Sequence, residues 1–149
     1  MSKIGYLIII LIISVLIYLK FPRKVTKTID QKIGNQNFLL EIADNPYLQA
    51  KGLSGRSKLC SNCGMLFIFN WETIQSFWMK DTMIPLDMMF INKNGQITDI
   101  YTATPQPGKS DFQLTLYQST LPSIYVIELN ANTVQKLNLK KGDLLKLNL

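Results

Sequence analysis

A short run of residues mixes aromatic and polar side chains in a way that could support chemistry. In FWMKDT (residues 77–82), an ammonium, a carboxylate and a hydroxyl group directly follow aromatic and apolar residues. Pro85 then forces an extended or turn backbone before Asp87. Aromatic walls that meet a few converging polar groups are typical of small-molecule sites. We therefore expect a ligand-binding groove near Trp78–Asp87.

Strand alternation indicates how this groove would be built. If Phe77 and Met79 face the core, Trp78 faces the opposite way, where its ring could stack on a sugar or an apolar ligand. Large apolar residues in strands more often simply pack in a core. The expected ligand-binding residues share a charge, a hydroxyl or an exposed aromatic ring, and are Arg56, Trp78, Lys80, Asp81, Thr82, Asp87 and Glu128.

Each charged candidate also has a structural interpretation. Arg56 could bind a ligand carboxylate, or equally pair with Asp87 or Glu128 inside the fold. Glu128 lies in an apolar strand and needs a partner if it faces inward, and we expect Arg56 or Lys80 in that role. Asp87 could instead cap the turn at Pro85. Structural ion pairing is the commoner outcome for such groups.

Two other functions remain open beside ligand binding. Asp81 and Asp87 could form a carboxylate pair of the glycosidase type, which needs a separation of about 5 Å or 6.5–9.5 Å. A structural or protein-interaction module would have no small-molecule site near Trp78. The sequence has no histidine, which excludes His-based acid–base catalysis and His-ligated metals. Because no catalytic set is recognisable, we favour binding of a small ligand, a saccharide or envelope-derived molecule, without turnover.

The chain contains two cysteines, Cys60 and Cys63. A structural zinc site would need a second such pair or histidines. Redox catalysis would place the motif at a helix start, whereas Gly64 and a strand-like run follow it. A local disulfide or a thiol pair that stiffens the loop is the favoured interpretation. No metal and no cofactor are predicted.

The net charge of +6 does not indicate a nucleic-acid partner. Of the 16 basic residues, five lie within the first 27 positions, which leaves 11 against 10 acidic residues in the rest. A nearly neutral body with no basic stripe and no nucleic-acid motif is a poor binder of polyanions.

Residues 4–19 form an uncharged, mostly aliphatic run between Lys3 and Lys20. Such a run predicts a transmembrane helix that contacts the lipid bilayer, slightly short at about 24 Å, with the flanking lysines reaching the interfaces. No A-x-A-like cleavage site follows it, which argues against a cleaved signal peptide. A literal positive-inside count would put the body in the cytoplasm. Since the paired cysteines favour an oxidising side, we expect a single-pass protein of the cell membrane with its domain outside.

We divide the chain into an anchor (1–20), a basic juxtamembrane linker (21–35) and a β-rich domain (36–149). The expected fold is mainly β, a small barrel-like or sandwich domain with two short helices. Asn45-Pro46 predicts a helix over 46–51, and a further helical turn or two is expected over 132–139. Asn94-Gly95 is a strong hairpin signal. Strands are expected over 37–43, 65–69, 74–79, 88–91, 97–100, 112–117, 124–129 and 144–149.

Several segments, taken together, resemble the domain of unknown function 192 family. They are KGL (51–53), GR (55–56), GMLF (64–67), FWMK (77–80), Thr82, PLD (85–87), FI (90–91), YVIE (125–128) and GD (142–143). The resemblance covers nearly all of 37–147 and implies a small β-rich domain, often behind a signal or anchor. It implies no reaction. Asp81 stands where the family usually has Asn, CSNC (60–63) replaces an acidic loop, and 102–119 lacks the loop cysteines of other members.

Overall fold

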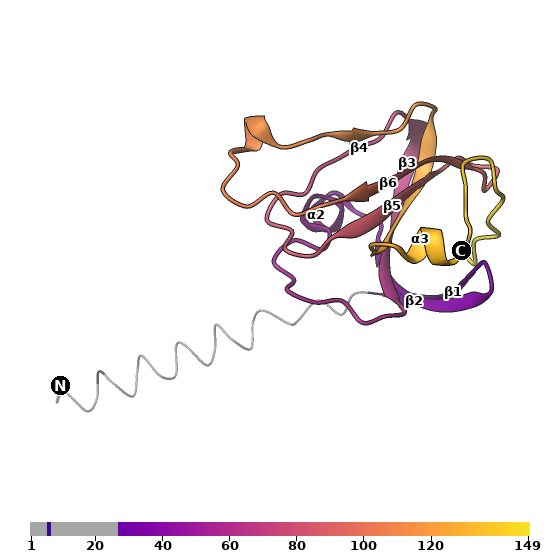
Figure 1. Cartoon of the computed structure of the whole chain (residues 1–149), viewed down its shortest axis with the longest axis horizontal. Helices are drawn as coiled ribbons and strands as arrows, with labels where there is room; N and C mark the ends of the chain where they lie inside the picture. The colour runs from indigo at the N-terminus through magenta and orange to yellow at the C-terminus, as the bar shows by residue number, and fades with distance from the viewer. Residues whose placement is uncertain (1–5, 7–26) are drawn as a thin grey trace.

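Six strands form one open sheet in the order β1-β2-β3-β8-β5-β6 (Figure 1). The computed structural model describes Tyr6 and residues 27–149. β2 and β3 run parallel, and the other neighbouring pairs are antiparallel. The strands are β1 (Thr28–Ile33), β2 (Gln36–Ala43), β3 (Cys63–Thr73), β5 (Leu86–Ile91), β6 (Ile97–Ala103) and β8 (Ser123–Asn130).

Three short helical segments and a small second sheet complete the described fold. They are α2 (Pro46–Lys51), α3 (Thr133–Lys136), the 3-10 helix η1 (Asp111–Gln113), and the pair β4 (Ser76–Phe77) and β7 (Tyr117–Gln118). The segment with η1, orange in Figure 1, projects away from the large sheet.

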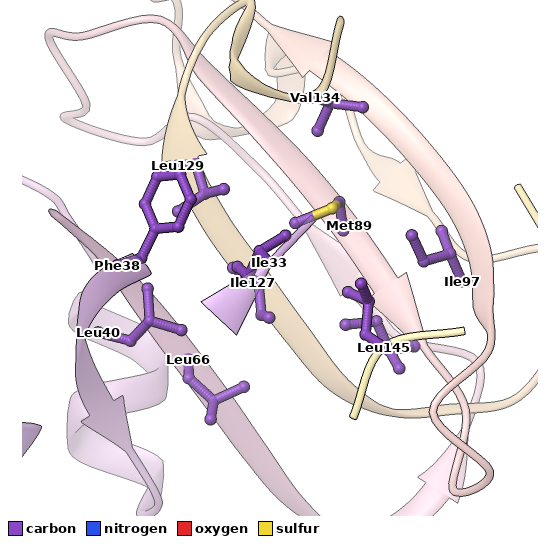
Figure 2. Close-up of a cluster of buried hydrophobic side chains, with 11 residues drawn as sticks. Ile33, Phe38, Leu40, Leu66, Met89, Ile97, Ile127, Leu129, Val134 and Leu145 are labelled. Atoms are coloured by element: carbon purple, nitrogen blue, oxygen red, sulfur yellow. The ribbon is translucent and has the colours of Figure 1, made fainter. Parts of the chain in front are cut away.

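Both faces of the sheet are buried, because alternate residues of the central strands contribute to two separate cores. On the first face, Leu66, Met89 and Ile127 pack with side chains from β1, β2, α3 and the C-terminal segment (Figure 2). On the second face, Phe67, Met88, Phe90 and Val126 pack under the α2 region and the segment after β4. We call these the first and the second face below. All six residues of β5 are buried, as expected for a strand covered on both sides.

The sheet does not close into a barrel, so that part of the fold prediction is wrong. The edge strands β1 and β6 are joined instead by the C-terminal segment, which was expected to be a strand over 144–149. It forms one isolated bridge, Gln96–Leu144. Farther along, the buried Gln31 side chain donates to the Lys146 carbonyl and accepts from the Asn148 N–H, both at 2.8 Å. The start of the segment is held by backbone bonds, from the Ile97 N–H to the Asp143 carbonyl at 2.9 Å and from the Leu145 N–H to the Gly95 carbonyl at 2.8 Å, and Leu145 is buried on the first face.

The predictions based on a helix cap and on a hairpin turn are confirmed. α2 covers 46–51, and the Asn45 side chain accepts from the Leu48 N–H at 3.1 Å as its N-cap. The Asn94-Gly95 hairpin joins β5 and β6, with Gly95 at φ +79°. A β-carbon there would lie 2.4 Å from the Leu145 carbonyl oxygen, so the turn and the C-terminal segment both require glycine.

Other predictions need correction. The second half of the predicted linker 21–35 is β1, whose residues 29, 31 and 33 face inward at the sheet edge. The predicted strand 112–117 is mostly η1 and a loop, in which Phe112 is fully exposed, and only Tyr117 lies in a strand, β7. β3 extends through the expected polar turn to Thr73, and the predicted strand 74–79 is reduced to the two residues of β4, which pair only with the short β7. No helix among the described residues is long and apolar enough to cross a membrane, and the predicted anchor over 4–19 lies outside them.

Candidate functional site

A hollow of about 330 Å³ lies on the second face, beside the end of α2 and β4. We call it the Glu128 hollow. Its apolar walls include Phe67, Phe69, Phe77 and Trp78, and its polar lining consists of Gln49, Lys51, Gln75, Ser76, Lys80, Thr82 and Glu128. Aromatic walls with a few polar groups match the general composition of ligand sites.

Glu128 is the least ordinary residue of this lining. It is 4% exposed, and it makes no hydrogen bond or ion pair with any of the described residues. Its neighbours in β8, Ile127 and Leu129, point to the first face, so alternation sends the carboxyl to the second. Burial raises the pKa of Glu128 to about 8, which leaves it mostly protonated at neutral pH.

Gly52, at the C-terminus of α2, leaves room for the Glu128 carboxyl because it has no side chain. Gly52 has φ +48°, and a β-carbon on it would lie 3.4 Å from the Phe67 ring and 4.0 Å from Glu128 Oε2. A side chain at this position would therefore be strained and would narrow the hollow next to the acid.

Edge-to-face aromatic contacts fix the wall of the hollow. The Phe77 ring lies 4.8 Å from that of Phe67 and 5.6 Å from that of Phe90, between ring centroids. Met79 is buried and Trp78 remains 43% exposed, as the alternation predicted. The hollow thus presents an indole that is held on a rigid support but is open to solvent.

Lys80 lies beside that indole. Its Nζ is 5.6 Å from the centroid of the Trp78 ring and forms an ion pair with Asp111 of η1. The hydrogen bond to Asp111 raises the pKa of Lys80, and the nearby charge of Asp81 acts in the same direction. Lys80 therefore places a permanent positive charge next to the exposed aromatic ring.

Two glutamines hold other parts of the lining. The Gln49 amide donates to the Ile68 carbonyl at 2.7 Å, and the Gln75 amide donates to the Ser123 carbonyl at 3.1 Å. Within the described part of the chain, neither side-chain oxygen accepts a hydrogen bond. Both oxygens, like the Glu128 carboxyl, can accept from hydroxyl groups of a bound molecule.

Asp87 does not belong to the hollow. It accepts from Thr102 Oγ1 at 2.7 Å and from the Val134 N–H at 2.9 Å, on the first face of the sheet. It therefore ties α3 to β5 rather than capping the turn at Pro85.

Asp81 is exposed, with φ +51°. It lines a neighbouring cavity of about 490 Å³, together with Lys80, Thr82 and the loop 105–114. The two carboxylates predicted as a pair thus lie on different faces.

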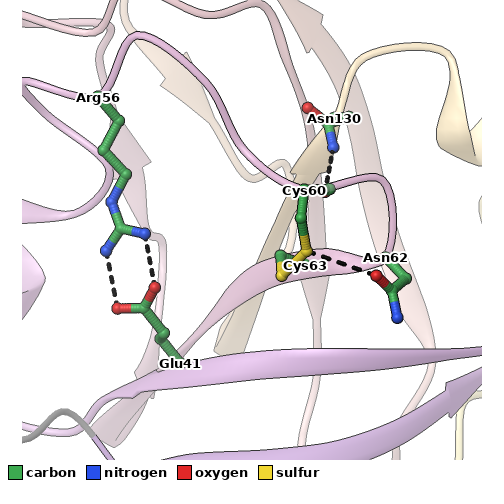
Figure 3. Close-up of a disulfide and its surroundings, with 6 residues drawn as sticks. All are labelled: Glu41, Arg56, Cys60, Asn62, Cys63 and Asn130. Atoms are coloured by element: carbon green, nitrogen blue, oxygen red, sulfur yellow. Dashed lines mark hydrogen bonds and ion pairs between the residues drawn. A yellow bond between two sulfur atoms is a disulfide. The ribbon is translucent and has the colours of Figure 1, made fainter.

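Arg56 is engaged elsewhere as well. It forms a two-pronged ion pair with Glu41, at 2.5 and 2.7 Å, rather than with Asp87 or Glu128 (Figure 3). The Glu41 hydrogen bond raises the pKa of Arg56.

Thr82 is nearly buried, and its hydroxyl donates to the Lys80 carbonyl at 3.1 Å. The residue lines both the Glu128 hollow and the neighbouring cavity.

Cys60 and Cys63 form a disulfide at the start of β3 (Figure 3). The Asn130 side chain donates to the Cys60 carbonyl at 2.8 Å, which fixes this loop to the end of β8. No group of three or more potential metal ligands is found among the described residues. The disulfide thus stiffens a loop and adds no group to the hollow.

Of the predicted site residues, Trp78, Lys80, Thr82 and Glu128 come together in the hollow. Sequence reasoning missed Gln49, Lys51, Gly52 and Gln75, because their place depends on how α2 and β4 pack against β8. KGL (51–53), within the family resemblance, could have pointed to Lys51 and Gly52, whereas no signal pointed to Gln49 or Gln75.

Comparison with known proteins agrees with this fold. No curated protein matches the chain. A crystal structure of a proposed transcription regulator from Sinorhizobium meliloti is 37% identical, with TM-score 0.67 over 74% of this chain and 82% of that one. A protein of unknown function from Novosphingobium aromaticivorans is 27% identical, with TM-score 0.70 over 85% and 90%. A family model described as uncharacterized ACR, domain of unknown function 192, matches residues 26–147. The chain therefore belongs to this uncharacterised family.

Proposed function

We propose that the domain binds a small, hydroxyl-rich ligand of the saccharide type in the Glu128 hollow, without turning it over. The observation that carries the proposal is the Glu128 carboxyl, which is buried, has no partner among the described residues, and borders an open cavity. No fully buried side-chain oxygen or nitrogen of the described residues lacks a hydrogen-bond partner, so the Glu128 oxygens, which have none there, are reached through this cavity. A ligand hydroxyl in the cavity can therefore form a hydrogen bond with the carboxyl.

The rest of the lining fits a sugar better than a purely apolar molecule. Trp78 offers an exposed ring for the apolar face of a pyranose, and the oxygens of Gln49 and Gln75 can accept from its hydroxyls. The geometry does not favour a carboxylate hydrolase, because Asp87 is bound to Thr102 and Val134 on the opposite face.

An envelope location is part of this proposal. The uncharged run over 4–19 would hold the domain at the cell membrane, and the disulfide suits an oxidising compartment outside the cytoplasm. The ligand would then be a saccharide of the envelope or a fragment of one.

Calorimetric titration of the full chain in mild detergent, with a panel of neutral and acidic hexoses and N-acetylhexosamines, tests the proposal. Trp78→Ala should weaken binding about tenfold, since one stacking contact is worth roughly 1–1.5 kcal/mol. Trp71→Ala is the matched control, because Trp71 is 78% exposed and lies outside the hollow. Binding that survives Trp78→Ala undiminished, or no binding of any sugar in the panel, would refute the proposal.

A further inference from the structure

The charges that line the Glu128 hollow are unbalanced. Lys51 and Lys80 are its two basic residues, and Glu128 is its one acidic residue. Lys51 forms no ion pair with another described residue, whereas Lys80 pairs with Asp111, which lines the neighbouring cavity instead. Lys51 is therefore the lining charge that no described carboxylate neutralises, while Lys80 shares its charge with Asp111 and the nearby Asp81.

The position of one lysine relative to the aromatic ring adds a geometric constraint. Lys80 Nζ lies 5.6 Å from the centre of the Trp78 ring. A sugar that packs against this indole must then carry one of its substituents close to a cation. A hydroxyl there can accept a hydrogen bond from the ammonium group, whereas a carboxylate gains in addition the Coulomb attraction between opposite charges.

Glu128 does not oppose an anionic group in the same cavity. Because burial raises its pKa to about 8, the carboxyl is largely uncharged at pH 7. It can accept from a sugar hydroxyl, and it adds little repulsion toward a second carboxyl group.

We infer that the saccharide bound in the Glu128 hollow carries an acidic substituent, of the uronic-acid kind, placed between Lys51 and Lys80 against Trp78. The inference rests on the proposed function and names the ligand class for the same site. Neutral sugars would bind through Trp78, Glu128 and the two glutamines, without a contribution from the lysine charges.

The test compares D-glucuronate with D-glucose by calorimetric titration of the full chain at pH 7. Glucuronate should bind about fivefold or more tightly, and the difference should shrink at high salt, because the lysines are near the surface. Lys51→Gln and Lys80→Gln should each reduce that preference about two- to fivefold, and the double variant should abolish it. Lys93→Gln is the matched control, since Lys93 pairs with Glu72 outside the hollow.

The outcomes separate this inference from the proposed function. Equal affinity for the two sugars, with both lost in Trp78→Ala, overturns the acidic class and leaves saccharide binding standing. A preference for glucuronate that persists in the double lysine variant also overturns the inference, since the carboxylate would then be recognised elsewhere. Failure of both sugars to bind overturns the inference, and it overturns the proposed function as well only if the other hexoses and the N-acetylhexosamines of the panel also fail to bind. Thermal unfolding of each variant confirms that lost binding is not lost folding.

Discussion

Replacing Glu128 by glutamine should stabilise the protein in a pH-dependent way. The side chains have nearly the same shape, but glutamine cannot ionise. In the unfolded chain the Glu128 carboxyl titrates near its ordinary pKa of 4.5, whereas burial raises the pKa to about 8 in the folded protein. Between these values unfolding releases a proton, so the free energy of unfolding falls as pH rises. Glu128→Gln removes this loss.

The magnitude follows from the two pKa values. Each pH unit costs about 1.4 kcal/mol in this range, and the full interval between 4.5 and 8 corresponds to roughly 5 kcal/mol. Below about pH 4.5 the carboxyl is protonated in both the folded and the unfolded state, and Glu128 causes no such loss of stability. Above about pH 8 it is ionised in both states, and the loss of stability no longer changes with pH. Since small domains have total stabilities of about 5–15 kcal/mol, the effect should be easy to measure.

Urea unfolding at pH 5, 6, 7 and 8, followed by tryptophan fluorescence, provides the assay. The gap between Glu128→Gln and the wild type should widen steadily with pH, in favour of the variant. Glu72→Gln removes a glutamate that pairs with Lys93 and lies outside the hollow, and it controls for the general loss of one carboxylate. A gap that is constant with pH, or a glutamine variant that loses stability toward pH 8, would refute the argument that Glu128 is buried without a partner.

Three further predictions concern the fold. Replacing both Cys60 and Cys63 by serine should lower the free energy of unfolding by about 2 kcal/mol, the chain-entropy value for so short a loop; unchanged urea midpoints would contradict a stabilising disulfide. Asp87→Ala should lower the free energy of unfolding by about 2–4 kcal/mol, because it removes the two hydrogen bonds that the buried Asp87 accepts. The folded variant should keep its affinity for sugars. Loss of affinity without loss of stability would instead support the hydrolase pair. Gly95→Ala should lower the free energy of unfolding, measured in urea, by at least about 1 kcal/mol more than Gly108→Ala does. Both glycines have positive φ, but only at Gly95 would a β-carbon meet a backbone oxygen. Equal losses would show that the C-terminal segment does not pack closely against the hairpin.

Local signals in the sequence predicted the parts of the fold that local physics determines. The Asn45 cap, Gly52 and Asn94-Gly95 all act within a few residues, and the structure has the expected helix and hairpin there. By contrast, β1 lies in a polar stretch and is a strand because it pairs with β2 across a tight turn at Gly34. The open sheet depends on bonds between Gln31 and the chain beyond Lys146, more than 100 residues away, which no local pattern indicates.

The candidate site was predictable to a similar extent. Alternation placed Trp78 in solvent and Met79 in the core correctly, although both residues lie just beyond the end of β4 at Phe77. Alternation also puts Asp87 and Met88 of β5 on opposite faces of the sheet. The sequence does not show which of these faces carries the hollow, so it could not exclude Asp87 from the site. The partner of Arg56 could not be inferred either, since Glu41 reaches it only through the parallel pairing of β2 with β3.

The most direct test of saccharide binding at this hollow is an NMR titration of the two tryptophan indole N–H resonances with D-glucuronate. Trp78 lines the hollow and Trp71 does not, so a single sample contains both the probe and its control. Saturable displacement of the Trp78 resonance, with Trp71 unmoved, is the predicted result. Resonances that both stay in place, or that shift together without saturating, would contradict a binding site at Glu128 and Trp78.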